Sequence, residues 1–172
     1  MKKITLVLLS FLFCGFCIAQ NAPTGYVDLG LSSGTQNAPT GYVDLGLSSG
    51  TLWKTSNENV VLSYGSAVNS FGSSLPTMEQ WMELRNECQW TWSGMGYVIK
   101  GPNGEILRLP AASTKDCDGV TYDFGVGEMG NYWSSTRVNR DDAWSLDFTA
   151  EKISIEATLK CHRYSIRLVS TK

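Results

Sequence analysis

The sequence predicts a domain of the α+β class, and three observations support this assignment. Apolar and polar residues alternate strictly over Ala143–Phe148, which is typical of a half-buried strand. A capping-box pattern at Thr77–Gln80 opens a stretch in which apolar residues recur at helical spacing. Gly-Pro-Asn-Gly at 101–104 separates two short apolar segments, which indicates a hairpin. Hairpins interrupted by few helices place the chain in the α+β class.

Residues 1–19 have the pattern of a secretory signal peptide. A Lys-Lys pair is followed by Ile4–Phe13, an apolar segment too short to span a bilayer, and Ala19 ends a Cys-Ile-Ala cleavage pattern. We expect cleavage after Ala19, export to the periplasm, the cell surface or the medium, and no membrane span in the mature chain. A lipoprotein anchor at Cys14 or Cys17 is the alternative, which the phenylalanine before each cysteine disfavours.

Residues 20–35 recur without any change as residues 36–51. Two copies are too few for a solenoid, so the identity indicates a recent tandem duplication. Each copy contains one strand candidate, Tyr-Val-Asp-Leu. The second copy continues directly into Leu52-Trp53-Lys54, so we expect it to dock on the domain. The first copy is then a surplus arm that competes for the same place or adds a strand to a neighbouring molecule.

Residues 36–172 are expected to form a single domain. The formal net charge of the chain is −2, and no basic patch suggests a nucleic-acid or anionic-membrane partner. Helices are predicted at 64–71, ending at Gly72, and at about 78–88, with Trp81, Leu84 and Cys88 on the buried face. Strands are predicted at 42–45, 97–100, 105–109, 152–157 and 164–169, and a hairpin at 130–148.

Three cysteines remain after the predicted cleavage: Cys88, Cys117 and Cys161. An odd number in an exported protein allows one internal disulfide and one free thiol. Cys117–Cys161 is the preferred pair because Cys88 lies on an apolar helix face; three reduced, partly buried cysteines are the alternative. The spacings match no zinc pattern, and the only histidine, His162, follows Cys161 directly. Neighbours on a strand point to opposite faces, which disfavours a Cys–His nucleophile.

Seven segments follow one another in a recognisable order: YVDLGLSSGTLW (42–53), LPTMEQWMEL (75–84), CQWTW (88–92), YVIKGPNGEILRLPAA (97–112), NYWSST (131–136), AWSLDF (143–148) and YSIRLV (164–169). Together they resemble the exported bacterial domains of the Fibrobacter succinogenes major paralogous domain family and the related C-terminal domain of a collagen-like adhesin. The resemblance implies a C-type-lectin-like fold, with two helices packed on twisted antiparallel sheets and adjacent N- and C-terminal strands. It also implies a surface or secreted protein that binds a glycan or takes part in adhesion.

A ligand site is expected on the outward side of the C-terminal hairpin. The alternation directs Trp144, Leu146 and Phe148 to the core and the residues between them to solvent. The candidate contact residues are Arg137, Asn139, Arg140, Asp141, Asp142, Ser145, Asp147 and Thr149. A merely solvated face is the alternative.

The tryptophans divide into a set predicted for the core and a pair that could contact a ligand. Trp53, Trp81, Trp133 and Trp144 are predicted to fill the core. Trp90 and Trp92 lie two residues apart and share a face, and exposure of one of them would suit stacking against a sugar ring.

The expected function is that of an exported, non-catalytic domain recognising a glycan or protein ligand at the cell surface, of unknown oligomeric state. The alternatives are an assembly component that pairs through its duplicated strand, and a formylglycine-generating-type enzyme, whose cysteine pair has no counterpart here. No cofactor is expected. A lectin-like fold suggests calcium as a possible ligand. The sequence offers only two short acidic segments for it, Asp116–Gly119 and Asp141-Asp142, and neither has the signatures of calcium-dependent sugar binders.

Overall fold

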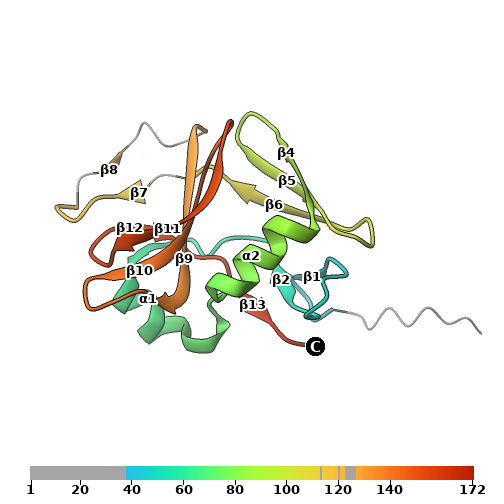
Figure 1. The fold of residues 1–172 in the computed structure, drawn as a ribbon, viewed down its shortest axis with the longest axis horizontal. Helices are drawn as coiled ribbons and strands as arrows, with labels where there is room; N and C mark the ends of the chain where they lie inside the picture. Colours follow the sequence, from blue (N-terminus) through green and yellow to red (C-terminus); the bar gives the residue numbers. More distant parts are fainter. Residues whose placement is uncertain (1–37, 113, 120, 123–126) are drawn as a thin grey trace, which may run out of the picture. The chain divides into compact units, whose positions relative to one another are not determined.

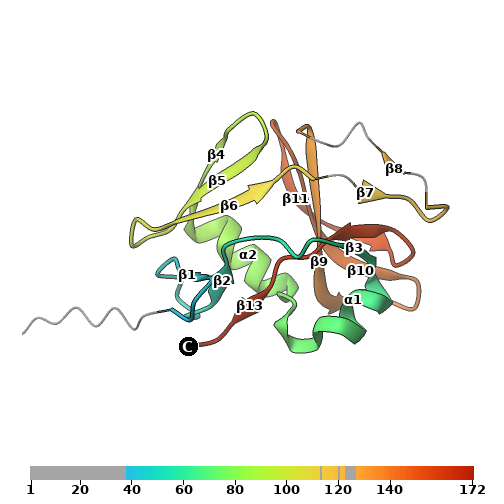
Figure 2. The same cartoon turned by 180° about the vertical axis from the view of Figure 1, so that it is seen from behind.

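A computed structural model describes residues 38–112, 114–119, 121–122 and 127–172 of the chain (Figures 1 and 2). The predicted signal peptide and the first repeat copy lie outside these residues. The elements are β1 (Tyr42–Asp44), β2 (Leu52–Lys54), β3 (Val61–Ser63), α1 (Tyr64–Phe71), a 3₁₀ turn (Gly72–Ser74), α2 (Met78–Glu87), β4 (Gln89–Trp92), β5 (Gly96–Lys100), β6 (Ile106–Pro110), β7 (Thr114–Lys115), β8 (Thr121–Tyr122), β9 (Met129–Arg137), β10 (Asp142–Thr149), β11 (Ile153–Leu159), β12 (Arg163–Ser165) and β13 (Val169–Ser170). The predicted α+β class is confirmed.

Three sheets are present in the described part of the chain. The largest has the order β11-β10-β9-β12-β7-β8, with β3 paired to β12; the other two have the orders β1-β2-β13 and β4-β5-β6. The pairings are antiparallel except for β12 with β9. In the second of the three sheets, β2 lies between β1 and the C-terminal strand β13. Both views show the C-terminus next to these strands (Figures 1 and 2).

Both predicted helices form because their ends carry the expected caps. Gly72 ends α1 with φ 50°, and its N–H donates to the carbonyl of Val68. Thr77 and Gln80 form the predicted capping box at the start of α2. Helix α2 buries Trp81 and Leu84 completely against β9, β10 and β11, while Cys88 is half-buried at its end.

The hydrophobic core consists of two clusters on opposite sides of the β9–β10 hairpin. The larger cluster includes Trp53, Trp81, Tyr132, Leu146 and Phe148. The smaller one surrounds Trp133 and Ala143 and is covered by α1 and by the chain after β12. The core roles predicted for Trp53, Trp81 and Trp133 are therefore confirmed, since each is fully buried.

Trp144 is half-buried and belongs to neither core cluster, so its predicted core role is wrong. The register between β9 and β10 shifts between Ala143 and Ser145, which leaves Trp144 without an opposite residue on β9. Across β11 it faces only the small side chain of Ala157. A local irregularity of the sheet thus removes the partners that a regular hairpin would have supplied.

The second repeat copy docks as predicted, and α2 holds it in place. Leu45 and Leu47 enter the larger core cluster. The carboxylate of Glu87 accepts hydrogen bonds from the backbone N–H and hydroxyl of Ser48, both at 3.0 Å. Glu83 accepts the equivalent pair from Ser49, both at 2.6 Å. Charge-assisted hydrogen bonds of this kind anchor an otherwise irregular loop to a helix.

The predicted closing strand at 164–169 is divided between two sheets. Residues Arg163–Ser165 form β12 in the large sheet, and Val169–Ser170 form β13 in a small one. Arg167 lies in the crossing and is fully buried; its guanidinium donates to the carbonyls of Lys54 and Arg108 at 2.6 and 2.7 Å. These two carbonyls belong to β2 and β6, so the buried arginine ties the crossing segment to both strands, while its Nε has no hydrogen-bond partner among the described residues.

The structure joins Cys117 and Cys161, the pair preferred from the sequence, in a disulfide, with 4.7 Å between the Cα atoms. Cys88 is a free thiol, and its burial raises its pKa to about 11. The sulfur of Cys161 is therefore engaged in a bond and does not form a Cys–His pair with His162. Among the described residues, no helix is long and apolar enough to cross a membrane.

Candidate functional site

The candidate site is a shallow groove on one face of the three strands β9, β10 and β11. It has a volume of about 200 Å³ and is lined by Met129, Asn131, Asp147, Phe148, Thr149, Lys152, Ser154 and Glu156. We call it the Asp147 groove. Its centre is a row of three polar residues across the sheet, because Asp147 pairs with Asn131 on β9 and with Ser154 on β11. Directly opposite residues on adjacent strands project from the same face, so these three side chains meet.

Alternation along each strand explains why polar residues gather on this face. On β11, Ile153 and Ile155 pack against the larger core cluster, so Ser154 and Glu156 project from the other side. On β10, Leu146 and Phe148 lie in the same cluster, which directs Asp147 toward Ser154. The core therefore orients the groove residues without contacting them.

Ser145 was predicted to face solvent, and this is wrong, because it is fully buried. Its face of the sheet is open only at the end nearest Asp147. At the other end, the smaller core cluster around Trp133 and Ala143 covers it. Ser145 lies at the boundary and supports the site from beneath: its hydroxyl is 2.9 Å from the hydroxyl oxygen of Thr158.

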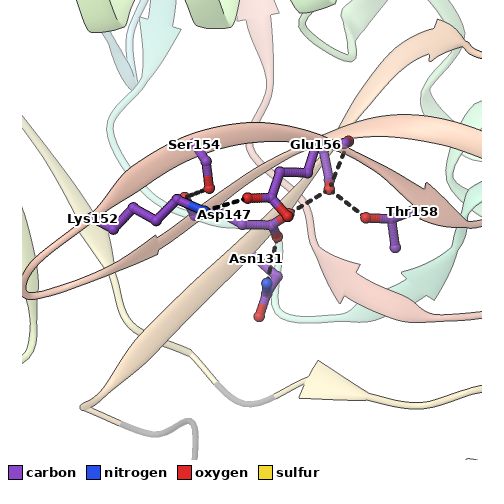
Figure 3. Close-up of polar contacts among 7 residues, drawn as sticks. Asn131, Asp147, Lys152, Ser154, Glu156 and Thr158 are labelled. Atoms are coloured by element: carbon purple, nitrogen blue, oxygen red, sulfur yellow. Dashed lines mark hydrogen bonds and ion pairs between the residues drawn. The ribbon is translucent and has the colours of Figure 1, made fainter.

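The Asp147 carboxyl is held on both of its oxygens by neutral donors (Figure 3). The amide nitrogen of Asn131 donates to Oδ1, and the hydroxyl of Ser145 donates to Oδ2 at 2.8 Å. Desolvation raises the pKa of Asp147, and these two hydrogen bonds oppose the rise. None of the ion pairs found in the described part of the chain includes Asp147. The groove therefore has at its floor a fixed carboxyl that forms no ion pair with the described residues.

The rim of the groove carries an ion pair between Lys152 and Glu156. The ammonium nitrogen lies 2.7 Å from Oε1 of the carboxylate, and the two side chains are 69 % and 50 % exposed (Figure 3). The hydrogen bond from Lys152 lowers the pKa of Glu156. Because an exposed pair of this kind contributes little to stability, both groups remain available to a ligand.

The other predicted contact residues divide into two sets. Thr149 lies in the groove, whereas the charged loop 137–142 lies at the opposite end of the hairpin. At a rise of about 3.3 Å per residue, Asp142 is roughly 16 Å from Asp147 along β10. The structure thus brings Ser145, Asp147 and Thr149 together and separates from them the five remaining candidates: Arg137, Asn139, Arg140, Asp141 and Asp142.

The polar groups of that loop stabilise its own turn. Asn139 Oδ1 accepts from the backbone N–H groups of Asp141 and Asp142 at 2.7 and 2.8 Å. The amide of Asn139 donates to a carboxylate oxygen of Asp142 at 2.8 Å, and Lys160 donates to the carbonyl of Arg140 at 2.7 Å. These contacts explain the composition of the loop as turn chemistry.

Metal ligands do not assemble at the acidic segments considered for calcium. At the first segment, Oδ1 of Asp116 accepts from the N–H of Asp118 at 3.0 Å, closing a turn. Within the residues that the structure describes, no group of three or more His, Cys, Asp and Glu side chains is placed to hold a metal ion. The Asp147 groove itself offers two carboxylates, Asp147 and Glu156, which is fewer than the six to eight oxygens that calcium prefers.

Besides Phe148, which was assigned to the core, five groove residues escaped the prediction from sequence: Met129, Asn131, Lys152, Ser154 and Glu156. Ser154 and Glu156 carried a usable signal, since they alternate with Ile153 and Ile155 in a segment predicted as a strand. Asn131 carried none, because only the cross-strand register places it beside Asp147. No family model, curated protein or solved structure matches this chain.

Proposed function

We propose that the chain is an exported, non-catalytic binding domain of the C-type-lectin-like type that recognises a glycan at the bacterial cell surface through the Asp147 groove. The seven ordered segments that resemble the Fibrobacter succinogenes major paralogous domain family support the fold and the exported location. Two helices packed against sheets, and a C-terminal strand beside the N-terminal strands, are compatible with that fold. The function rests on the chemistry of the groove.

The fixed carboxyl of Asp147 is the observation that carries the proposal. Each carboxylate oxygen has a further lone pair after accepting from Asn131 or Ser145, so both can accept from ligand hydroxyls. These acceptors are held in position before a ligand arrives, which lowers the entropic cost of binding. Small-ligand sites in general fix the orientation of a ligand through a few precisely placed polar groups, and this carboxyl is one such group.

The remaining lining supplies the other contacts that a sugar ring needs. Lys152 offers donors, Glu156 offers acceptors, and Thr149 and Ser154 offer hydroxyls that both donate and accept. Met129 adds exposed apolar surface for the C–H groups of a ring. Apolar walls with a few oriented polar groups characterise small-ligand sites in general.

A glycan array probed with the mature protein, with and without calcium, tests the proposal. We expect binding to a restricted set of glycans that Asp147→Asn abolishes, because the substitution replaces one acceptor oxygen by a donor while keeping the shape. Asp141→Asn is the matched control, since it changes an exposed carboxylate at the far end of the same hairpin. A blank array for the wild-type protein in both conditions would refute the proposal, as would equal loss of binding in the two variants.

A second candidate function, an assembly component, is favoured by the position of β1. This strand pairs only with β2 and forms the edge of its sheet in the described part of the chain. The first repeat copy carries the same strand sequence, and an exposed edge accepts a further strand by backbone hydrogen bonds. Sedimentation measurements test this: a monomer at all concentrations would exclude it, and loss of oligomers on deletion of residues 20–35 would support it.

A further inference from the structure

A second hollow adjoins the Asp147 groove and shares two of its walls, Met129 and Thr149. Its volume is about 360 Å³, and its other lining includes Trp92, Glu128, Ala150 and Glu151. We propose that the two hollows form one cleft for a linear oligosaccharide of neutral or amino sugars, with Trp92 as the stacking platform of the second subsite. This inference rests on the proposed function and names the ligand class that the cleft selects.

The size of the hollows supports a ligand of more than one sugar unit. Sites for small ligands usually have volumes of about 300–1,000 Å³, so the Asp147 groove by itself, at about 200 Å³, lies below that range. The adjoining hollow, at about 360 Å³, lies within it, so the Asp147 groove reaches the usual size only together with this neighbour across Met129 and Thr149. A chain of sugars that crosses this shared wall would use both.

Trp92 is held by its neighbours, and its indole N–H is unused within the described residues. Its ring makes edge-on contacts with Tyr97 and Phe148, at centroid distances of 5.1 and 6.3 Å, and it is half-buried at the end of β4. The indole N–H of Trp90, by contrast, donates to the carbonyl of Leu84 at 3.1 Å. The indole N–H of Trp92 has no acceptor among the described residues. A fixed aromatic face with a free N–H offers both stacking and a directed hydrogen bond to a sugar.

The charges along the cleft indicate which sugars it accepts. Four carboxyl groups line the two hollows, from Asp147, Glu156, Glu128 and Glu151, against the single ammonium of Lys152. Lys152 is already paired with Glu156. An anionic sugar, such as a uronic acid, would face uncompensated like charges, whereas neutral and amino sugars would not.

Titration calorimetry with three series of defined oligosaccharides tests the inference: cello-oligosaccharides as neutral probes, chitosan oligomers as amino-sugar probes and oligogalacturonates as acidic probes, each from one to six units. We expect affinity for a neutral or amino series to rise about tenfold or more once the chain is long enough to reach Trp92, as one stacked aromatic contact implies. Oligogalacturonates should not bind. Trp92→Ala and the milder Trp92→Phe should remove the dependence on length, fully and in part, while binding of the shortest sugars remains.

Trp144→Ala is the matched control, because it removes an equally half-buried tryptophan, on β10, that lines neither hollow. If Asp147→Asn abolishes binding but the Trp92 variants keep the full dependence on length, the second subsite is refuted and the proposed function stands. If no series binds although the glycan array is positive, the ligand class is refuted and the proposed function stands; if the array is blank as well, both are refuted. Tighter binding of oligogalacturonates, or of a lysine-rich peptide in the same titration, would overturn the assignment of the ligand class.

Discussion

The duplicated N-terminal segment leads to a prediction about Leu45. This residue is fully buried in the larger core cluster, and Leu29 occupies the equivalent position of the identical first copy. We consider Leu45→Asp, which places a carboxylate in the core. Because the first copy has every side chain that the docking site requires, we expect it to replace the damaged second copy.

The magnitude follows from two competing costs. Large-to-small substitution of a buried leucine costs about 2–5 kcal/mol, and burial of a charge adds to this, so the damaged copy would lose about 5 kcal/mol or more. Docking the first copy instead leaves the 16 residues of the second copy as a closed loop. Closing a loop of that length costs about 3 kcal/mol. The exchange therefore limits the loss to about 3 kcal/mol.

Urea unfolding followed by tryptophan fluorescence measures these free energies, since Trp53, Trp81 and Trp133 are all fully buried. We expect Leu45→Asp to cost about 2 kcal/mol more in a chain that also carries Leu29→Asp than in one with an intact first copy. Leu29→Asp by itself should change stability by less than about 0.5 kcal/mol. If Leu45→Asp costs the same with either residue at position 29, the first copy does not substitute for the second, and the reasoning fails.

Three further predictions concern the hairpin, the groove and the disulfide. Gly130→Ala should cost about 1–3 kcal/mol in thermal unfolding, because a Cβ at this position would lie 2.2 Å from the Phe148 ring. The double variant Gly130→Ala with Phe148→Leu should recover part of this loss of stability. An unchanged stability of the single variant would contradict the packing argument. Since the pKa of Asp147 is raised in the folded state, its ionisation destabilises the fold, so the stability of wild type relative to Asp147→Asn should be greatest below the unfolded pKa of about 3.9 and should decline as pH rises above it. A pH-independent difference would count against this. The comparison of two chains cancels the opposite contribution of Asp44, whose pKa is lowered and which does not interact with Asp147. Replacing Cys117 and Cys161 by serine should lower the free energy of unfolding by about 2–4 kcal/mol, since the disulfide closes a loop with a sequence separation of 44. An unchanged denaturation midpoint under oxidising conditions would show that the disulfide does not constrain the unfolded chain.

Local chemistry made several elements predictable from the sequence. The Thr77–Gln80 capping box and Gly72 act on their own helix ends, so α1 and α2 end within one residue of their predicted limits. The turn at 101–104 determines its hairpin in the same way, with Gly104 at φ 91°. The second repeat copy was placed correctly because it is covalently continuous with β2.

The site depended on relations that no short segment contains. Alternation on β10 separated two faces correctly, but it could not show that both are covered at the Ser145 end, since that depends on α1 and the chain after β12. The register of three strands brings Asn131, Asp147 and Ser154 into one row. Loop 137–142 had the composition of a binding site, yet its Asn139 and Asp142 side chains are engaged in its own turn.

The sequence by itself therefore determined the class of the fold, the helix ends, the main hairpins and the repeat that docks, because each follows from interactions between near neighbours in the chain. Only the tertiary structure decided which polar residues form a groove, which tryptophan lines a hollow beside it, and where the closing segment divides between sheets. These outcomes depend on cross-strand register and on which elements cover each face, and both are set by contacts between residues far apart in the sequence.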